Sequence, residues 1–305
     1  MDDASAKEFL TEGIGVNRKK MTASLATGCL LVSMLSAPMV CHGAEAATAS
    51  EQASKTENIA ETYREQATKL FAAGKFEEAA EFCKKAAQET KNNADDWAHC
   101  GMAYVEAKKF LEAAEAFKNA AKIDKKNDLY WAHAGGSYFE VKKFKEAANC
   151  LEKAAKLKPN NGEYHVWCGM SYWERVIQSS NDAARKAGFA PVTLDSLRQK
   201  ACQYLGRAAE LEPNNADVQK LGGYIIEQVA AESEASAKSP WIIVNWGAIA
   251  NKYRTVYQCY CRLLDIDPNN AEYIANLSRF IQDHPKYGFQ PYAGQKTPTA
   301  DNGGA

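Results

Sequence analysis

Residues 94–127 read ADDWAHCGMAYVEAKKFLEAAEAFKNAAKIDKKN, and residues 128–161 read DLYWAHAGGSYFEVKKFKEAANCLEKAAKLKPNN. The second segment repeats the first at an offset of 34 residues. The matched positions are Trp97 with Trp131, Gly101 with Gly135, Tyr104 with Tyr138, Phe110 with Phe144, Ala113 with Ala147, and Ala120 with Ala154. A period of this length is typical of helix–turn–helix units that stack into a solenoid. The matched small residues allow the two helices of each unit to pack closely.

These matched residues resemble the tetratricopeptide repeat family. The resemblance implies an all-α, right-handed α-solenoid in which the first helices of successive repeats line a concave groove that holds another protein. The family's best-known groove is a clamp of Lys, Asn and Arg for the C-terminal carboxylate of heat-shock chaperones. The matching positions here carry Arg64, Thr68, His99, Leu129 and His133, so we expect no such clamp.

The same pattern extends in both directions from this segment. We expect five repeats and a terminal capping helix, at residues 60–93, 94–127, 128–161, 162–215, 216–270 and 271–283. The fourth and fifth repeats are about 20 residues longer than the family period. Their excess lies near residues 177–196 and 229–250, which predicts two lengthened helical hairpins that stack on each other, sealed by the apolar run at 241–246. Gly74 is expected to end the first helix of the first repeat, and Lys108 and Lys142 take its place in the next two.

The first 46 residues have the three parts of a secretory signal peptide. A basic cluster at 18–20 precedes an apolar run at 25–40, and Ala44-Glu45-Ala46 provides small residues for cleavage. The apolar run is shorter than the roughly 20 residues of a spanning helix, although an uncleaved anchor and a lipoprotein at Cys29 stay open as alternatives. Acidic residues within 1–15 are unusual before such a signal, so we expect translation to start at Val16 or Met21. The sequence therefore predicts an exported protein, periplasmic or associated with a bacterial cell envelope.

Two further segments have compositions that predict no packed structure. Residues 47–58 have no apolar face and are expected to form a linker. Residues 284–305 contain few aliphatic side chains and are expected to form a disordered tail.

Composition and motifs argue against several classes of function. The formal net charge is −1, so the chain lacks the broad positive field of a nucleic-acid-binding protein. No catalytic motif, phosphate loop or cofactor site is present, and we expect neither an enzyme nor a bound cofactor. His99 and His133 are one repeat apart with His165 nearby, but helices packed about 8–10 Å apart hold them too far apart to share one metal ion.

Seven of the nine cysteines follow the expected cleavage site. We expect Cys83, Cys100, Cys150 and Cys168 to pack inward as small apolar side chains. Disulfides from Cys83 to Cys100 and from Cys150 to Cys168 are the alternative, because export would permit them.

From the resemblance, the residues expected to face the groove are Arg64, Phe71, His99, Met102, Glu106, His133, Phe139, Glu140, Trp167, Met170, Trp173, Glu174 and Tyr224. The aromatic side chains would form its floor. Glu106, Glu140 and Glu174 recur at the repeat period and would form a row of carboxylates along one wall. The alternative is that the aromatic rings are internal packing and the glutamates a solvated edge.

Aromatic residues, Met and Arg are enriched at the cores of protein interfaces. We therefore expect the groove to hold a partner peptide or helix that is apolar with basic flanks. We expect no nucleic-acid partner, and membrane contact only through an uncleaved signal. The leading hypothesis is a non-catalytic adaptor of the cell envelope. The second is a subunit of an envelope enzyme or assembly complex that docks through the two long hairpins.

Overall fold

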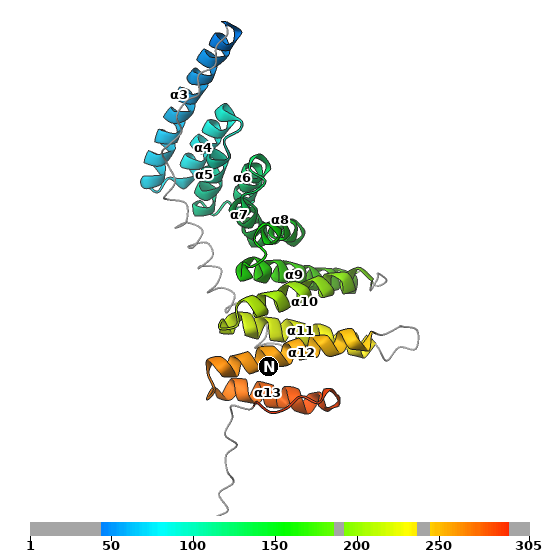
Figure 1. Ribbon diagram of the computed structural model, residues 1–305. Helices are drawn as coiled ribbons and strands as arrows, with labels where there is room; N and C mark the ends of the chain where they lie inside the picture. The colour runs from blue at the N-terminus through cyan, green and yellow to red at the C-terminus, as the bar shows by residue number, and fades with distance from the viewer. Residues whose placement is uncertain (1–43, 186–191, 237–244, 293–305) are drawn as a thin grey trace, which may run out of the picture. The chain divides into compact units, whose positions relative to one another are not determined.

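The computed structural model describes residues 44–185, 192–236 and 245–292 (Figure 1). Every regular element in these ranges is helical, which confirms the expected fold class: an array of eleven α-helices in which sequential helices pack as hairpins. The α-helices are α3 (Ala44–Ala72), α4 (Phe76–Thr90), α5 (Ala94–Glu106), α6 (Phe110–Ile123), α7 (Asp128–Glu140), α8 (Phe144–Leu157), α9 (Gly162–Arg185), α10 (Val192–Leu211), α11 (Ala216–Ser236), α12 (Trp246–Ile266) and α13 (Ala271–Asp283).

The chain divides into two units, residues 1–157 and 158–305. In the described part of unit 1, three helix pairs follow one another: α3 with α4, α5 with α6, and α7 with α8. In unit 2, α9 pairs with α10 and α11 with α12, and α13 packs against α12. Below, the first helix of each pair is called the first helix and its partner the second helix.

The repeating glycines lie where the two helices of a pair approach most closely. A Cβ atom on Gly101 would lie 2.9 Å from the ring of Phe117, and one on Gly135 would lie 2.5 Å from Cγ of Leu151. Phe117 and Leu151 are themselves 34 residues apart, so the two glycines have equivalent surroundings. The same contact recurs in unit 2 between Gly169 and Leu205. This position therefore requires the absence of a side chain.

The turns inside the three pairs of unit 1 share one backbone conformation. Gly74, Lys108 and Lys142 have φ values of 73°, 59° and 59°. In each turn the next residue's amide donates a bond back to the first helix, as from Lys109 to the Tyr104 carbonyl at 2.8 Å. Left-handed backbone costs a side-chain-bearing residue roughly 1–2 kcal/mol. Lys108 and Lys142 therefore hold a conformation that suits glycine better.

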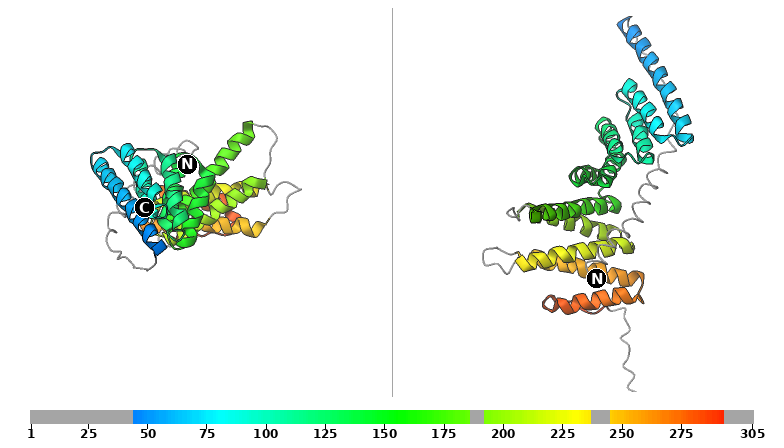
Figure 2. Two further views of the ribbon diagram at one scale, coloured as in Figure 1. Left: turned by 90° about the horizontal axis from the view of Figure 1, so that it is seen from above. Right: turned by 180° about the vertical axis from the view of Figure 1, so that it is seen from behind.

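The fourth and fifth pairs are lengthened as expected. Gly135 and its partner Leu151 are 16 residues apart, whereas Gly169 and Leu205 are 36 apart. The difference of 20 residues gives helices of 20 to 24 residues in α9–α12. The tips of both pairs point to the same side of unit 2 (Figure 2).

The two lengthened pairs stack on each other through α10 and α11. In the added length, Nε of Arg198 on α10 lies 2.6 Å from a carboxylate oxygen of Glu232 on α11. The predicted sealing run lies mostly outside the described residues, since of its six residues only Asn245 and Trp246 belong to them. Trp246 is 52% exposed.

The last helix has the character expected of a cap. On α13, Tyr273, Leu277 and Phe280 are buried, and Glu272, Ser278 and Gln282 face solvent. A solenoid needs such a polar outer face at its end.

The expectation of a disordered tail is wrong for residues 284–292, which we call the strap. Its first part forms a short 3₁₀ helix, Pro285–Tyr287. Aromatic contacts to α12 and α13 hold the rest in place, including Phe289 stacked on Tyr257. The sequence shows few aliphatic residues there, but rings rather than aliphatic chains provide the packing. Residues 293–305 lie outside the described part.

The expected linker at 47–58 is also wrong, because these residues belong to α3. They are rich in Ala, Glu, Gln and Lys, which favour helix without any apolar face. The signal features in residues 1–43 lie outside the described residues. In the described part of the chain, none of the helices combines the length and the apolar character that a membrane crossing requires.

The seven cysteines in the described ranges are free thiols. Cys100, Cys150 and Cys168 are buried, and Cys83 is half-buried. Burial raises the pKa of the Cys100 thiol to about 12 and that of Cys150 to about 11. These thiols are therefore protonated at neutral pH and act as small apolar side chains.

Candidate functional site

The first helices α3, α5 and α7 carry the part of the candidate face that belongs to unit 1. Phe71 is 41% exposed and contacts Phe76 edge-on, with ring centroids 5.0 Å apart. One repeat later, His99 and Glu106 are exposed and Met102 is half-buried. Aromatic, thioether and carboxylate groups therefore reach the surface along the first helices of this unit.

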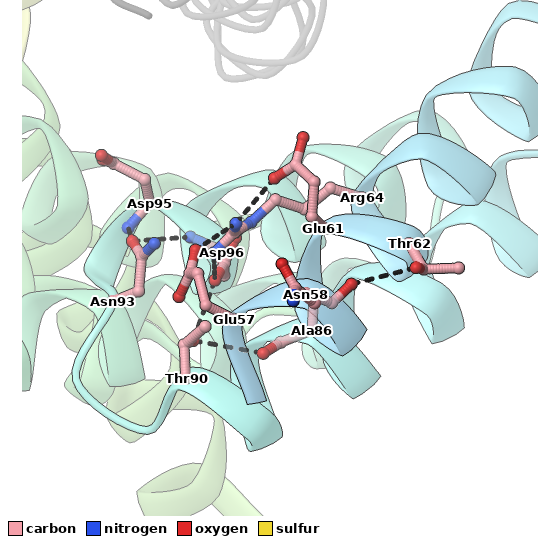
Figure 3. Close-up of polar contacts among 10 residues, drawn as sticks. All are labelled: Glu57, Asn58, Glu61, Thr62, Arg64, Ala86, Thr90, Asn93, Asp95 and Asp96. Carbon is pink, nitrogen blue, oxygen red and sulfur yellow. Dashed lines mark hydrogen bonds and ion pairs between the residues drawn. The ribbon is translucent and has the colours of Figure 1, made fainter. Parts of the chain in front are cut away.

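Arg64 was expected in the groove, but the structure uses it to join α3 to α5 (Figure 3). Its Nε and one terminal nitrogen donate to the two carboxylate oxygens of Asp96, at 2.7 and 2.9 Å. Its other terminal nitrogen donates to Glu57 at 2.8 Å and Glu61 at 3.0 Å. The hydrogen bond with Asp96 is the main cause that raises the pKa of Arg64. Arg64 is thus a fixed structural cation.

The acceptor of this bond is part of a polar centre at the start of α5. The Asn93 side chain caps the helix by accepting from the amides of Asp95 and Asp96 (Figure 3). Asp96 is only 3% exposed and also accepts from the Thr90 hydroxyl at 2.9 Å. Its neighbour Asp95 accepts from Tyr130 of α7 at 2.5 Å. Two consecutive carboxylates therefore link the middle first helix to the ones before and after it.

The sequence analysis did not identify this centre. A cap residue followed by two acids is a usual helix start, because acids favour the N-terminal end of the helix dipole. The only signal that could have revealed the linkage is the spacing of 32 residues between Arg64 and Asp96.

His133 lies on α7 one repeat after His99. Its ring stacks on Phe117, with centroids 4.7 Å apart and planes 19° apart. Burial lowers the pKa of His133 to about 4, so its ring is neutral at pH 7. In the described ranges, no three His, Cys, Asp or Glu side chains are grouped in a way that could hold a metal ion.

His165, the third histidine, serves the local structure of unit 2. Its Nε2 lies 2.8 Å from the carbonyl oxygen of Pro159, and the Trp131 indole makes the matching contact to Lys125 in unit 1 at 3.3 Å. Both contacts span six residues, so His165 replaces the tryptophan of the repeat pattern.

Several other predicted site residues lie in the interior. Phe139, Trp167 and Met170 are buried. For these three side chains, the alternative of internal packing describes the structure. Half-buried positions are taken by Glu140 of unit 1 and by Trp173, Glu174 and Tyr224 of unit 2. The accessible candidate face is therefore smaller than the sequence predicted and consists mainly of Phe71, His99, Met102 and Glu106.

The residues and their arrangement define a class: a helical repeat protein of the tetratricopeptide type, a fold whose role is to bind other proteins. The chain matches the family described as Psidin, N-terminal TPR repeats region, over residues 45–200, just over half of its length. The chain belongs to this family of tetratricopeptide repeat proteins.

Solved structures share the fold at low sequence identity. MamA from Desulfovibrio magneticus RS-1 is 15% identical, with a TM-score of 0.45 over 70% of this chain and 97% of that one. YrrB, described as a TPR protein with an unusual peptide-binding site, is 19% identical, with a TM-score of 0.46 over 77% of this chain and 100% of that one. The first TPR of Spaghetti (RPAP3), solved with an HSP90 peptide, is 24% identical, with a TM-score of 0.34 over 38% and 91%. These likenesses concern the fold alone, and no curated protein matched the chain.

Proposed function

We propose that the protein is a non-catalytic adaptor of a bacterial cell envelope that binds a partner peptide or helix on the first-helix face of unit 1. The observation that carries this proposal is the exposure of Phe71, His99 and Glu106 on successive first helices, although the rest of these helices is packed. Exposed apolar and aromatic groups next to charged ones are typical of protein-binding surfaces.

The charges of this face indicate the partner's chemistry. Glu65 and Glu106 are exposed carboxylates on neighbouring first helices. Arg64 is neutralised by its own carboxylate partners, and His133 is uncharged at pH 7. The face therefore presents negative charge beside apolar groups, which suits a partner that is apolar with basic flanks.

Location and the absence of catalysis are also parts of the proposal. The support for export is the sequence of residues 1–46, with its basic cluster, apolar run and small residues. The support for a non-catalytic role is that no catalytic motif is present in the sequence.

Site-specific photo-crosslinking in the native envelope tests the face. A photoreactive amino acid is placed at His99 and, as a matched control, at Glu115, which is exposed on the second helix α6. We expect one crosslinked partner from position 99 and none from position 115. Equal crosslinking from both positions would contradict the proposed face.

A second candidate function is docking through the long hairpins, as a subunit of an envelope enzyme or assembly complex. Exposure of Trp246 at the start of α12, inside the 229–250 hairpin, is the observation in its favour. Photoreactive groups at Ser196 and Ala235, both exposed on the hairpins, test it in the same experiment. Crosslinks from these positions alone would replace the first-helix face with the hairpins as the binding site.

A further inference from the structure

Unit 2 contains two matching polar contacts that join α11 to the helices after it. On α11, Glu227 and Glu234 are seven residues apart and each accepts a tyrosine hydroxyl from α12. Tyr260 donates to Glu227 at 2.6 Å, and Tyr253 donates to Glu234 at 2.9 Å. Because residues seven apart lie on the same helix face, the two contacts are steps of one ladder.

Each carboxylate of the ladder also holds a cation from the end of the chain. Arg279 of α13 bonds Glu227 at 3.2 and 3.4 Å. Lys286 of the strap forms an ion pair with Glu234. These two cations are also seven residues apart, so the strap continues the register of α13 although the helix has ended at Asp283.

The Lys286 ammonium group has aromatic neighbours as well as the carboxylate. It lies 5.3 Å from the ring centre of Trp246 and 5.1 Å from that of Tyr287. Rings within about 6 Å attract a cation through their negative faces. Carboxylate and rings together form a site suited to a lysine.

The rest of the strap runs along one face of α12. Phe289 stacks on Tyr257, with ring centroids 4.9 Å apart, and the Tyr257 hydroxyl donates to the Gln290 carbonyl at 3.0 Å. Tyr292 donates from its hydroxyl to Asp265. Tyr257 and Asp265 are eight residues apart and therefore lie on the same face of α12.

The exposure of the strap alternates as in an extended peptide bound to a surface. Tyr287 and Phe289 are half-buried, whereas Gly288 and Gln290 are exposed. Alternation with a period of two is the signature of an extended chain with one face bound. Below these rings lies Phe280 of α13, fully buried, with its ring centroid 5.3 Å from that of Phe289.

The strap is held by contacts at the surface rather than by deep burial. The Lys286 side chain is 52% exposed, and exposed ion pairs contribute little to stability. Segments with few buried contacts open locally without global unfolding. The face below the strap is aromatic and acidic, and opening of the strap would leave it open to a competing segment.

We propose that this face of α12 and α13 is a second peptide-binding surface, filled here by the chain's own strap. Its partner is an extended segment of another protein with the strap's chemistry: a lysine, aromatic residues one and three positions later, and a tyrosine six positions later. The surface is formed by Tyr253, Tyr257, Asp265 and Phe280, with Glu234 and Trp246 at the lysine site. It is separate from the first-helix face and does not rest on the function proposed above.

A binding experiment with the full-length chain tests this surface. The strap is weakened by Lys286→Ala with Phe289→Ala, and a fluorescent peptide of residues 284–292 is titrated with each protein by anisotropy. We expect the weakened variant to bind the peptide at least tenfold more tightly than the wild type, whose own strap competes. Ser278→Ala, an exposed polar change on α13, is the matched control and should behave as the wild type.

The specificity of the binding comes from the peptide. A peptide with Phe289→Ala should lose at least tenfold in affinity for the weakened variant. A folded variant, by circular dichroism, that binds neither peptide would overturn the proposal. Exchange of straps between wild-type copies, seen as a concentration-dependent dimer, would overturn the assignment of the surface to another protein.

A second measurement uses the wild type alone, in case the weakened variant fails to fold. Hydrogen exchange is followed by mass spectrometry with and without excess free peptide. We expect faster exchange in the strap because the peptide displaces it, and unchanged protection of α12. Unchanged exchange in the strap at saturating peptide would show that it is a permanent part of the fold and would refute the inference.

Discussion

Replacement of Gly135 by alanine tests the packing rule of the whole array. The new Cβ would lie 2.5 Å from Cγ of Leu151 and 3.3 Å from the backbone oxygen of Ala147. Leu151 is buried and the second atom belongs to the backbone, so neither can move away at low cost. Overpacking of this kind costs about 1–3 kcal/mol. Alanine gains about 1 kcal/mol in helix propensity, and we expect a net destabilisation of about 1–2 kcal/mol.

Gly206 offers a matched control on α10. A Cβ there would meet nothing closer than 3.8 Å. The same substitution should therefore stabilise the protein by about 1 kcal/mol through helix propensity alone. Opposite signs at the two glycines would separate the effect of the close contact from that of the residue type.

The measurement is urea unfolding followed by circular dichroism. Hydrogen exchange of α7 and α8 is measured as well, because repeat arrays can unfold in parts. Leu151→Ala removes the clashing atoms, so Gly135→Ala should cost at least 1 kcal/mol less in that background than in the wild type. If Gly135→Ala stabilises as much as Gly206→Ala, the close approach of α7 and α8 is not what selects glycine.

Three further predictions concern unit 1. Lys108→Gly should raise the free energy of unfolding by about 1 kcal/mol, because glycine adopts the left-handed turn without steric cost; chemical denaturation measures it. Asp96→Asn should lower the free energy of unfolding by about 2 kcal/mol, because Arg64 then loses its charged acceptor; thermal melting at equal ionic strength measures it. His133→Asn should flatten the pH dependence of stability between pH 6.5 and about 4. In the wild type the unfolded chain binds the proton more readily there, so stability falls as pH falls.

Each of these three has its own control. Lys109→Gly, at a residue with φ of −89°, should give no stabilisation, and equal gains at both lysines would contradict the turn argument. Arg64→Met in the Asp96→Asn background should recover part of the loss, and a further loss would count against the ion pair. His99→Asn, at an exposed ring one repeat earlier, should leave the pH profile unchanged.

The sequence predicts the repeat architecture well because one physical requirement recurs. Gly101 and Gly135 share an offset with their contact residues, and that offset alone reveals the helix pairs and the lengthened hairpins. The cap is predictable for the same reason, since α13 repeats a first helix.

The candidate site was less predictable because helical periodicity does not distinguish a solvent-facing position from one covered by a neighbouring helix. Phe139 and Met170 follow the same period as exposed residues yet are buried. The role of Arg64 depends on a carboxylate 32 residues away, and no local pattern records that pairing. The strap was missed because aromatic rings spaced by two residues carry no helical or strand signal of their own.

The equal lengthening of two consecutive hairpins has an evolutionary consequence. Twenty extra residues divided between two arms extend each by roughly 15 Å at 1.5 Å per residue. Because Arg198 and Glu232 pair within that added length, a deletion in one hairpin strands the matching arm of the other. Shortening both together removes the need for a neighbour, so natural variants of this chain should gain or lose these arms as a pair.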